Sequence, residues 1–191
     1  MGFKVLVGIS NKHLHLSEAD LAALFGAGHK LTVKKDLRQA GQYAAEETVD
    51  VVGPKGTLKG IRVLGPTRKE SQVELAQTDA RTIGLTLPVR ESGVLDNTPG
   101  VKLIGPAGEV TLSKGAIIAL RHIHLSPAEA AEAGVKDKDR VTVNTFGSRP
   151  LIFEDVLIRI GNFVNEFHVD TDEGNAAGIT NGDMVEIIGK K

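Results

Sequence analysis

Four of the six histidines in this 191-residue chain occur in two copies of one short motif. The copies read His13-Leu14-His15-Leu16-Ser17 and His122-Ile123-His124-Leu125-Ser126. In an extended strand, residues i and i+2 point to the same side, so each pair directs two imidazoles toward one point while the residue between them faces a core. A single pair of this kind is often two ordinary surface histidines. Two copies favour metal binding, because a duplicated structural corner would not need four imidazoles.

Each histidine pair is followed by the signals of a helix start. Ser17 can cap a helix that we predict from Glu18 to Phe25. The run Ser126-Pro127-Ala128-Glu129 reads as a capping box with proline at the first helical position. We therefore expect both histidine pairs at rigid corners where a strand passes into a helix.

Composition excludes several classes of function. With a net charge of −1, no basic run and seven aromatic residues, the chain offers no surface for nucleic acid. It contains neither a signal peptide nor an apolar run of membrane-spanning length, so we predict a cytoplasmic protein without a membrane partner. The absence of cysteine excludes thiolate ligands and a cysteine nucleophile. Any metal must therefore be held by nitrogen and oxygen, which suits zinc or another divalent first-row ion.

A polar segment after a predicted strand supplies further candidates. Arg68, Gln72 and Glu74 alternate, so an extended segment would present a cation, an amide and a carboxylate on one face. An arginine fork matches phosphate, and a glutamate can bind a metal ion. The alternative is a charged edge strand that discourages aggregation.

The two remaining histidines differ in their surroundings. His168 shares a predicted strand face with Asp170, so it could be a third ligand with Asp170 or Asp172 as its partner. A solvated strand histidine is the alternative. His29 lies in a glycine-rich loop, and we expect it to be a polar loop residue without a partner.

Short apolar runs between turn signals predict a mainly β protein with short helices, one of them from Thr171 to Ala177. The sequence Gly-Pro-x-Gly ends two of the runs, at residues 53–56 and 105–108, which favours meanders or barrels over βαβ units. We predict two linked small β-barrels with the active site at their junction. Residues 1–12 and 120–191 would form a discontinuous first barrel, and residues 13–119 the second.

Several long motifs in the same order resemble the PduL-type phosphotransacylases, also called phosphate propanoyltransferases, over nearly the whole chain. These motifs are Ser10–Ser17, Lys35–Thr48, Val63–Arg68, Arg121–Ser126 and His168–Glu173. The resemblance implies reversible acyl exchange between acyl-CoA and inorganic phosphate on two β-barrels with two zinc ions. Some members carry an extension that directs them into microcompartments; because the first strand here begins by Phe3, the chain resembles either an untargeted or a truncated form.

The resemblance assigns roles to individual residues. One zinc would be held by His13, His15 and Glu74, and the other by His122, His124 and His168. Arg68 would bind phosphate. Coenzyme A would contact Ile9, Ser10, Asn11, Lys55, Arg62 and Asn175.

We expect phosphate to attack the thioester directly, with Ser71 or Ser92 as the alternative nucleophile. Two other functions stay open from the residues alone. A metal-dependent acyl-CoA hydrolase would release the acid without phosphate. A non-catalytic zinc-stabilised interaction module would fill every coordination position with protein ligands. The acyl chain is left open as well, and so is a homodimer.

Overall fold

A computed structural model describes residues 2–191, and these residues divide into two compact units. Unit 1 combines residues 2–11 with Leu120–Lys191, and unit 2 consists of Lys12–Ala119. Each unit has its own cluster of buried apolar side chains. The two units are therefore described separately.

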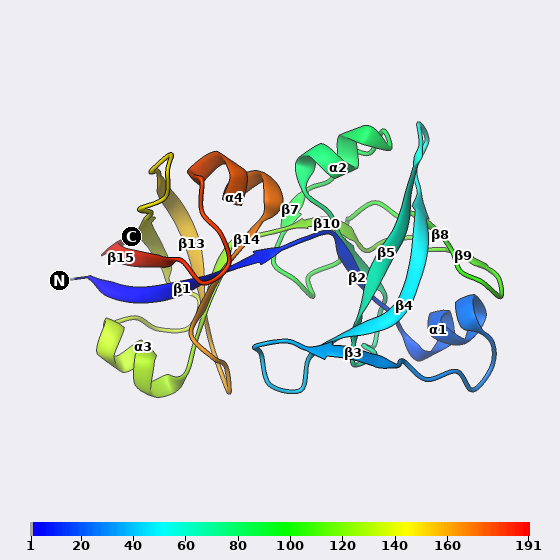
Figure 1. The fold of residues 1–191 in the computed structure, drawn as a ribbon, viewed down its shortest axis with the longest axis horizontal. Coiled ribbons are helices and arrows are strands. Elements are labelled where there is room, and N and C mark those ends of the chain that lie inside the picture. Colours follow the sequence, from blue (N-terminus) through cyan, green and yellow to red (C-terminus); the bar gives the residue numbers. More distant parts are fainter. Residues whose placement is uncertain (1) are drawn as a thin grey trace. The chain divides into compact units, whose positions relative to one another are not determined.

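Unit 1 is a closed barrel of six strands in the order β1-β14-β11-β13-β12-β15. Figure 1 shows the first strand of the chain beside strands from its last third. Val5 and Val7 of β1 and Phe167 and Val169 of β14 are spaced two residues apart in their strands and pack in the core. The elements of unit 1 are β1 (Phe3–Ser10), β11 (His122–Leu125), α3 (Pro127–Ala133), β12 (Arg140–Asn144), β13 (Ile152–Ile160), β14 (Glu166–Asp170), α4 (Thr171–Ala177) and β15 (Met184–Lys190).

Unit 2 is a curled sheet of nine strands in the order β7-β10-β6-β2-β5-β4-β8-β9, with β3 paired to β4. The two Gly-Pro-x-Gly sequences form equivalent turns, in which Gly53 N donates to Gly56 O and Gly105 N donates to Gly108 O, both at 2.9 Å. The elements of unit 2 are β2 (His13–His15), α1 (Glu18–Phe25), β3 (Val33–Asp36), β4 (Tyr43–Val52), β5 (Thr57–Gly65), β6 (Gln72–Glu74), α2 (Gln77–Thr82), β7 (Val89–Arg90), β8 (Lys102–Ile104), β9 (Glu109–Thr111) and β10 (Ala116–Ala119).

The strand-to-helix corners form as the sequence predicts. The Ser17 side chain accepts a hydrogen bond from Asp20 N at the start of α1, and Ser126 forms a complete capping box with Glu129 at the start of α3. Leu14 and Ile123, the residues between the paired histidines, are fully buried in the two cores. Each histidine pair is thus fixed by a buried side chain within it and a capped helix after it.

The predicted fold class is confirmed: the described residues are mainly β with four short helices, in one closed barrel and one curled sheet. The predicted helices Glu18–Phe25 and Thr171–Ala177 are also confirmed. Helix α2 was not predicted, because its N-cap residue, Ala76, has no side chain that could cap it. Within residues 2–191, none of the helices has the length and apolar character needed to cross a bilayer.

Candidate metal centres and phosphate site

The first candidate centre lies in unit 2, where the antiparallel strands β2 and β6 place His13 opposite Glu74. His13 Nε2 lies 3.5 Å from Glu74 Oε2, and His15 Nε2 lies 4.0 Å from Glu74 Oε1. One ligand atom from each of these three buried residues lies within 4.8 Å of the others. On the far side of its ring, His15 Nδ1 lies 3.1 Å from Leu64 O, which leaves Nε2 directed toward the carboxylate.

Burial and neighbouring charges set the protonation states of His15 and Glu74 in this centre. Burial, and then the neighbouring charges of His13 and Arg68, lower the pKa of His15 from its ordinary value of 6.5 to about 3. Burial alone would raise the pKa of the Glu74 carboxyl, but the charge and hydrogen bond of His13 and the charge of His15 hold it well below its ordinary range. A neutral His15 beside an ionised Glu74 is the combination of protonation states that a divalent metal ion requires.

A polar network surrounds Glu74. Ser92 Oγ donates to Glu74 Oε1 at 2.9 Å, and Gln72 Nε2 donates both to that oxygen and, at 2.9 Å, to Ser92 Oγ. Arg68 Nη1 lies 3.3 Å from Ser92 Oγ, so the half-buried guanidinium stands beside the carboxylate network. The structure thus brings together the arginine, amide and glutamate that alternate in the sequence, and it adds Ser92.

The second candidate centre lies in unit 1, where β11 and β14 place His122 opposite His168. The rings of these two residues are stacked with their centroids 5.0 Å apart, and the His124 ring lies 4.7 Å from the first and 4.9 Å from the second. One nitrogen from each histidine lies within 4.8 Å of the others. His122 Nδ1 lies 2.9 Å from Leu120 O, which leaves its Nε2 for another partner.

His124 provides the test of whether this second centre suits a metal ion. Both of its ring nitrogens are buried, and neither has a hydrogen-bond partner in the described part of the chain. Burial, and then the charges of His122, His168 and Arg159, lower the pKa of His124 to about 2. A neutral imidazole with unpaired buried nitrogens is costly unless it binds a ligand, so the three histidines fit a divalent ion.

Glu166 belongs to the surroundings of this centre and was missed by the sequence analysis. Its Oε2 lies 3.0 Å from Nε2 of His168, the position for which we considered Asp170. The Asp170 side chain instead caps α4 by accepting a hydrogen bond from Glu173 N. The signal for Glu166 was present, because it precedes His168 by two residues and therefore shares its strand face.

The candidate coenzyme A residues divide between the units. In unit 1, the Ile9 side chain lies against Gly174 in the middle of α4, directly before Asn175. In unit 2, Lys55 lies in an exposed turn, whereas Arg62 Nη1 donates to the main-chain oxygens of Ala45 and Glu46. The candidates of unit 1 are Ile9, Ser10, Asn11 and Asn175, and those of unit 2 are Lys55 and Arg62.

His29 is not the unpartnered loop residue that we expected. Its Nε2 lies 2.9 Å from Oε1 of Glu47, a buried carboxylate that also accepts hydrogen bonds from Thr32. The His29 ring stacks on Phe25 with a centroid distance of 5.1 Å. His29 therefore links the loop after α1 to strand β4 through its contact with Glu47.

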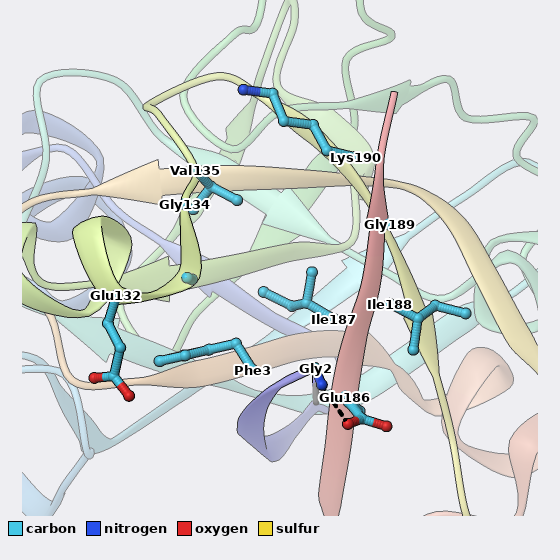
Figure 2. A pocket seen from close by; sticks show the side chains of 11 residues that line it. Gly2, Phe3, Glu132, Gly134, Val135, Glu186, Ile187, Ile188, Gly189 and Lys190 are labelled. Atoms are coloured by element: carbon cyan, nitrogen blue, oxygen red, sulfur yellow. Dashed lines mark hydrogen bonds between the residues drawn. The ribbon is translucent and has the colours of Figure 1, made fainter.

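A cavity of about 660 Å³ in unit 1 lies away from the candidate residues. Figure 2 shows its lining by the start of β1, the end of α3 and β15, with Gly2 N donating to Glu186 Oε1 at 2.8 Å. Ile9 and Ser10 lie at the other end of β1. No histidine lines this cavity, so it has no part in either candidate metal centre.

The fold and the two centres define a mainly β protein with two groups of side chains that could each hold a metal ion. The sequence model of the phosphate propanoyltransferase family matches residues 6–180. Relatives named phosphate propanoyltransferase include one from Thermotoga maritima, 57% identical over 96% of this chain and 89% of that protein. Another, from Rhodopseudomonas palustris, is 48% identical over 98% of this chain and 84% of that protein. The chain belongs to the phosphate propanoyltransferase family and is an acyltransferase.

Proposed function

We propose that this enzyme transfers a short acyl group reversibly between coenzyme A and inorganic phosphate. The observation that carries this proposal is the family match across residues 6–180, which includes both histidine motifs and Arg68. The names of the relatives, phosphate propanoyltransferase, specify an acyl group and phosphate. The geometry around Arg68 and the two centres supports the same chemistry.

Two zinc ions form part of the proposal. His13, His15 and Glu74 would hold one, and His122, His124 and His168 the other. Zinc bound at these positions would supply a Lewis acid that stabilises the negative charge developing on the thioester oxygen or the departing sulfur. In the described residues each centre offers three protein ligands, one fewer than a closed structural zinc site uses. This count favours catalysis over a non-catalytic interaction module.

Arg68 would hold the attacking phosphate. Its guanidinium is always charged, and its planar fork can bind two phosphate oxygens at once. The contact with Ser92 Oγ at 3.3 Å keeps it beside the first centre. Because both substrates would be bound side by side, orientation alone could lower the barrier by up to about 7–11 kcal/mol.

Direct displacement by phosphate agrees with the positions of the two candidate serines. The Ser92 hydroxyl donates to Glu74, and the Ser71 hydroxyl donates to Asp20 while accepting a hydrogen bond from Ser17 N. Both hydroxyl protons are thus engaged with carboxylates. Coenzyme A would bind along Ile9, Ser10, Asn11 and Asn175, with Lys55 and Arg62 as partners for its phosphates.

The decisive experiment measures thiol release from acetyl-CoA and propanoyl-CoA with and without phosphate. The proposal predicts that release depends on phosphate and that acyl phosphate appears in equal amount. Release at a comparable rate without phosphate would contradict the transferase and indicate a hydrolase. Elemental analysis of protein purified without chelators should find about two divalent metals per chain, as two three-ligand centres require.

A further inference from the structure

Glu166 is a buried carboxylate that the proposed reaction does not use. Its side chain lies on the same face of β14 as His168, and only 6% of the residue is exposed. Oε2 lies 3.0 Å from His168 Nε2, which is hydrogen-bonding distance, although the ring is not aligned to donate. Catalytic hydrogen bonds are often poorly aligned before the ligand binds. A buried carboxylate at this distance therefore bears directly on how the His168 ring is held.

Gly8 supplies the space in which Glu166 fits. This glycine lies on β1 and is paired with His168 of β14. A Cβ atom at Gly8 would lie 2.6 Å from Glu166 Oε1 and 2.7 Å from its Cδ, too close for any real contact. Any other residue at position 8 would thus push the carboxylate away from its present place. The position of the Glu166 side chain on β14 therefore depends on the absence of a side chain at Gly8 on the neighbouring strand β1.

Glu166 lies outside the set of candidate ligands. Among the described residues, the group with ligand atoms within 4.8 Å of one another consists of His122, His124 and His168, without this carboxylate. A carboxylate behind a metal-binding histidine fixes the orientation and tautomer of the ring and strengthens its basicity. The other two histidines have different hydrogen-bond surroundings: His122 Nδ1 lies 2.9 Å from Leu120 O, and neither ring nitrogen of His124 has a hydrogen-bond partner in residues 2–191.

We propose that Glu166, seated in the space left by Gly8, is a positioning residue for His168. By accepting the proton of Nε2, it would leave Nδ1 of His168 for the metal. This inference rests on the proposed function, because it concerns the metal centre of unit 1. It assigns Gly8 and Glu166 to the centre although neither residue contacts the metal.

The test measures metal affinity instead of turnover. All variants carry His13→Ala, which removes the unit 2 centre, and His13→Ala alone is the reference protein. Zinc binding at the unit 1 centre is then measured by competition with a chromophoric chelator. Glu166→Gln preserves volume but removes the charge, and it should weaken zinc binding by roughly 10–100-fold. It should also change the visible absorption spectrum of the cobalt-substituted protein. Glu132→Gln, an exposed change on α3 in the same unit, is the matched control and should leave both unchanged.

Gly8→Ala provides the second arm. It should weaken zinc binding as Glu166→Gln does, whereas Gly189→Ala, where the nearest atom to a new Cβ lies 3.8 Å away, should not. The double variant Gly8→Ala/Glu166→Gln should bind zinc about as weakly as either single variant, since both changes remove one interaction. If Gly8→Ala does not fold, Glu166→Gln alone decides the question.

The outcomes separate this inference from the proposed function. If the His13→Ala reference protein binds no zinc, the metal centre of unit 1 is wrong and this inference falls with it. If the reference binds zinc and Glu166→Gln binds it equally well, only the positioning role is overturned. Loss of thermal stability in Glu166→Gln with an unchanged chelator competition and cobalt spectrum would likewise overturn it, because that is the behaviour of a purely structural residue.

Discussion

The two candidate centres grow from the same histidine motif but differ in their third ligand. In unit 2 the third candidate ligand is a carboxylate, Glu74, whose pKa is held low by the neighbouring histidines. In unit 1 it is another imidazole, His168, and the nearby carboxylate Glu166 stands behind that ring. A divalent ion held by three neutral imidazoles keeps a formal charge of +2, whereas a carboxylate ligand reduces it to +1. The unit 1 centre is therefore the stronger candidate for a Lewis acid.

The cations beside the two centres differ as well. Arg68 stands next to the carboxylate network of unit 2 through Ser92. Arg159 is paired with His124 across β13 and β11, and its guanidinium lies 6.0 Å from the ring of Phe163, which stacks on His124. In the proposed function, Arg68 would hold an anion beside a centre of reduced charge, whereas Arg159 lies against the ring of Phe163. The same strand-to-helix corner thus supports two chemically different sites.

Removing one candidate ligand should have the largest effect on metal content and activity. The same variants test whether the two centres bind metal independently. His122→Ala and Glu74→Ala should each lower the metal content from about two ions per chain to one. Each should lower activity by more than about a hundredfold, since even changes behind a ligand cost up to that amount. Elemental analysis and steady-state assays measure both quantities. His29→Ala is the control and should retain both metals; loss of two ions from either single variant would show that the centres are coupled.

Arg68→Lys tests which centre receives phosphate. Lysine keeps the charge but loses the planar fork, and one charge-assisted contact is typically worth about 1.5–3 kcal/mol. The phosphate-dependent rate should therefore fall at least roughly tenfold, through a higher KM for phosphate, a lower kcat or both, with the metal content unchanged. Arg81→Lys, an exposed change on α2, should behave as wild type. An unaltered phosphate curve for Arg68→Lys would remove this residue from the site.

Acid should destabilise the metal-free protein through one histidine in each unit. His15 and His124 have folded-state pKa values lowered to about 3 and about 2, so they stay neutral in the folded chain below pH 6.5 while the unfolded chain binds protons there. The free energy of unfolding should thus fall as pH decreases from 6.5, by about 1 kcal/mol per histidine at pH 5.5. Urea titrations of metal-free protein at pH 6.5 and 5.5 measure this loss. His124→Gln should show about half of it, and a full loss in that variant would contradict the assignment.

Removing the helix caps should have the smallest effect on stability, and the effect should be similar for the two units. Ser17→Ala and Ser126→Ala each remove a side-chain acceptor at the start of a helix, which typically costs about 1 kcal/mol. Denaturant unfolding near neutral pH measures both losses. A much larger loss at Ser17 would show that its contacts with Asp20 add to the cap and that the two corners differ in stability.

The features that the sequence predicts well are local. The convergence of His13 and His15 depends only on the two-residue repeat of a strand, and the corner that follows depends on a cap within three residues. The place of Glu166 on the strand face of His168 follows from the same two-residue repeat, but its contact with Gly8 escapes such reasoning because it joins strands from opposite ends of the chain. The pair His29 and Glu47 escapes for the same reason, since a loop and a strand must first be brought together.

The pairing of β1 with strands near the end of the chain sets the order in which the centres can be completed during synthesis. Gly2 N finds its acceptor on Glu186, 184 positions later, so the barrel cannot close until translation is almost finished (Figure 1). The ligands of unit 2 all precede residue 75, whereas His168 follows much later. At about 5–20 residues per second, the ribosome needs roughly 5–20 s to pass from Glu74 to His168. The candidate ligands of unit 2 would therefore be available to a metal ion seconds before the candidate centre of unit 1 is complete.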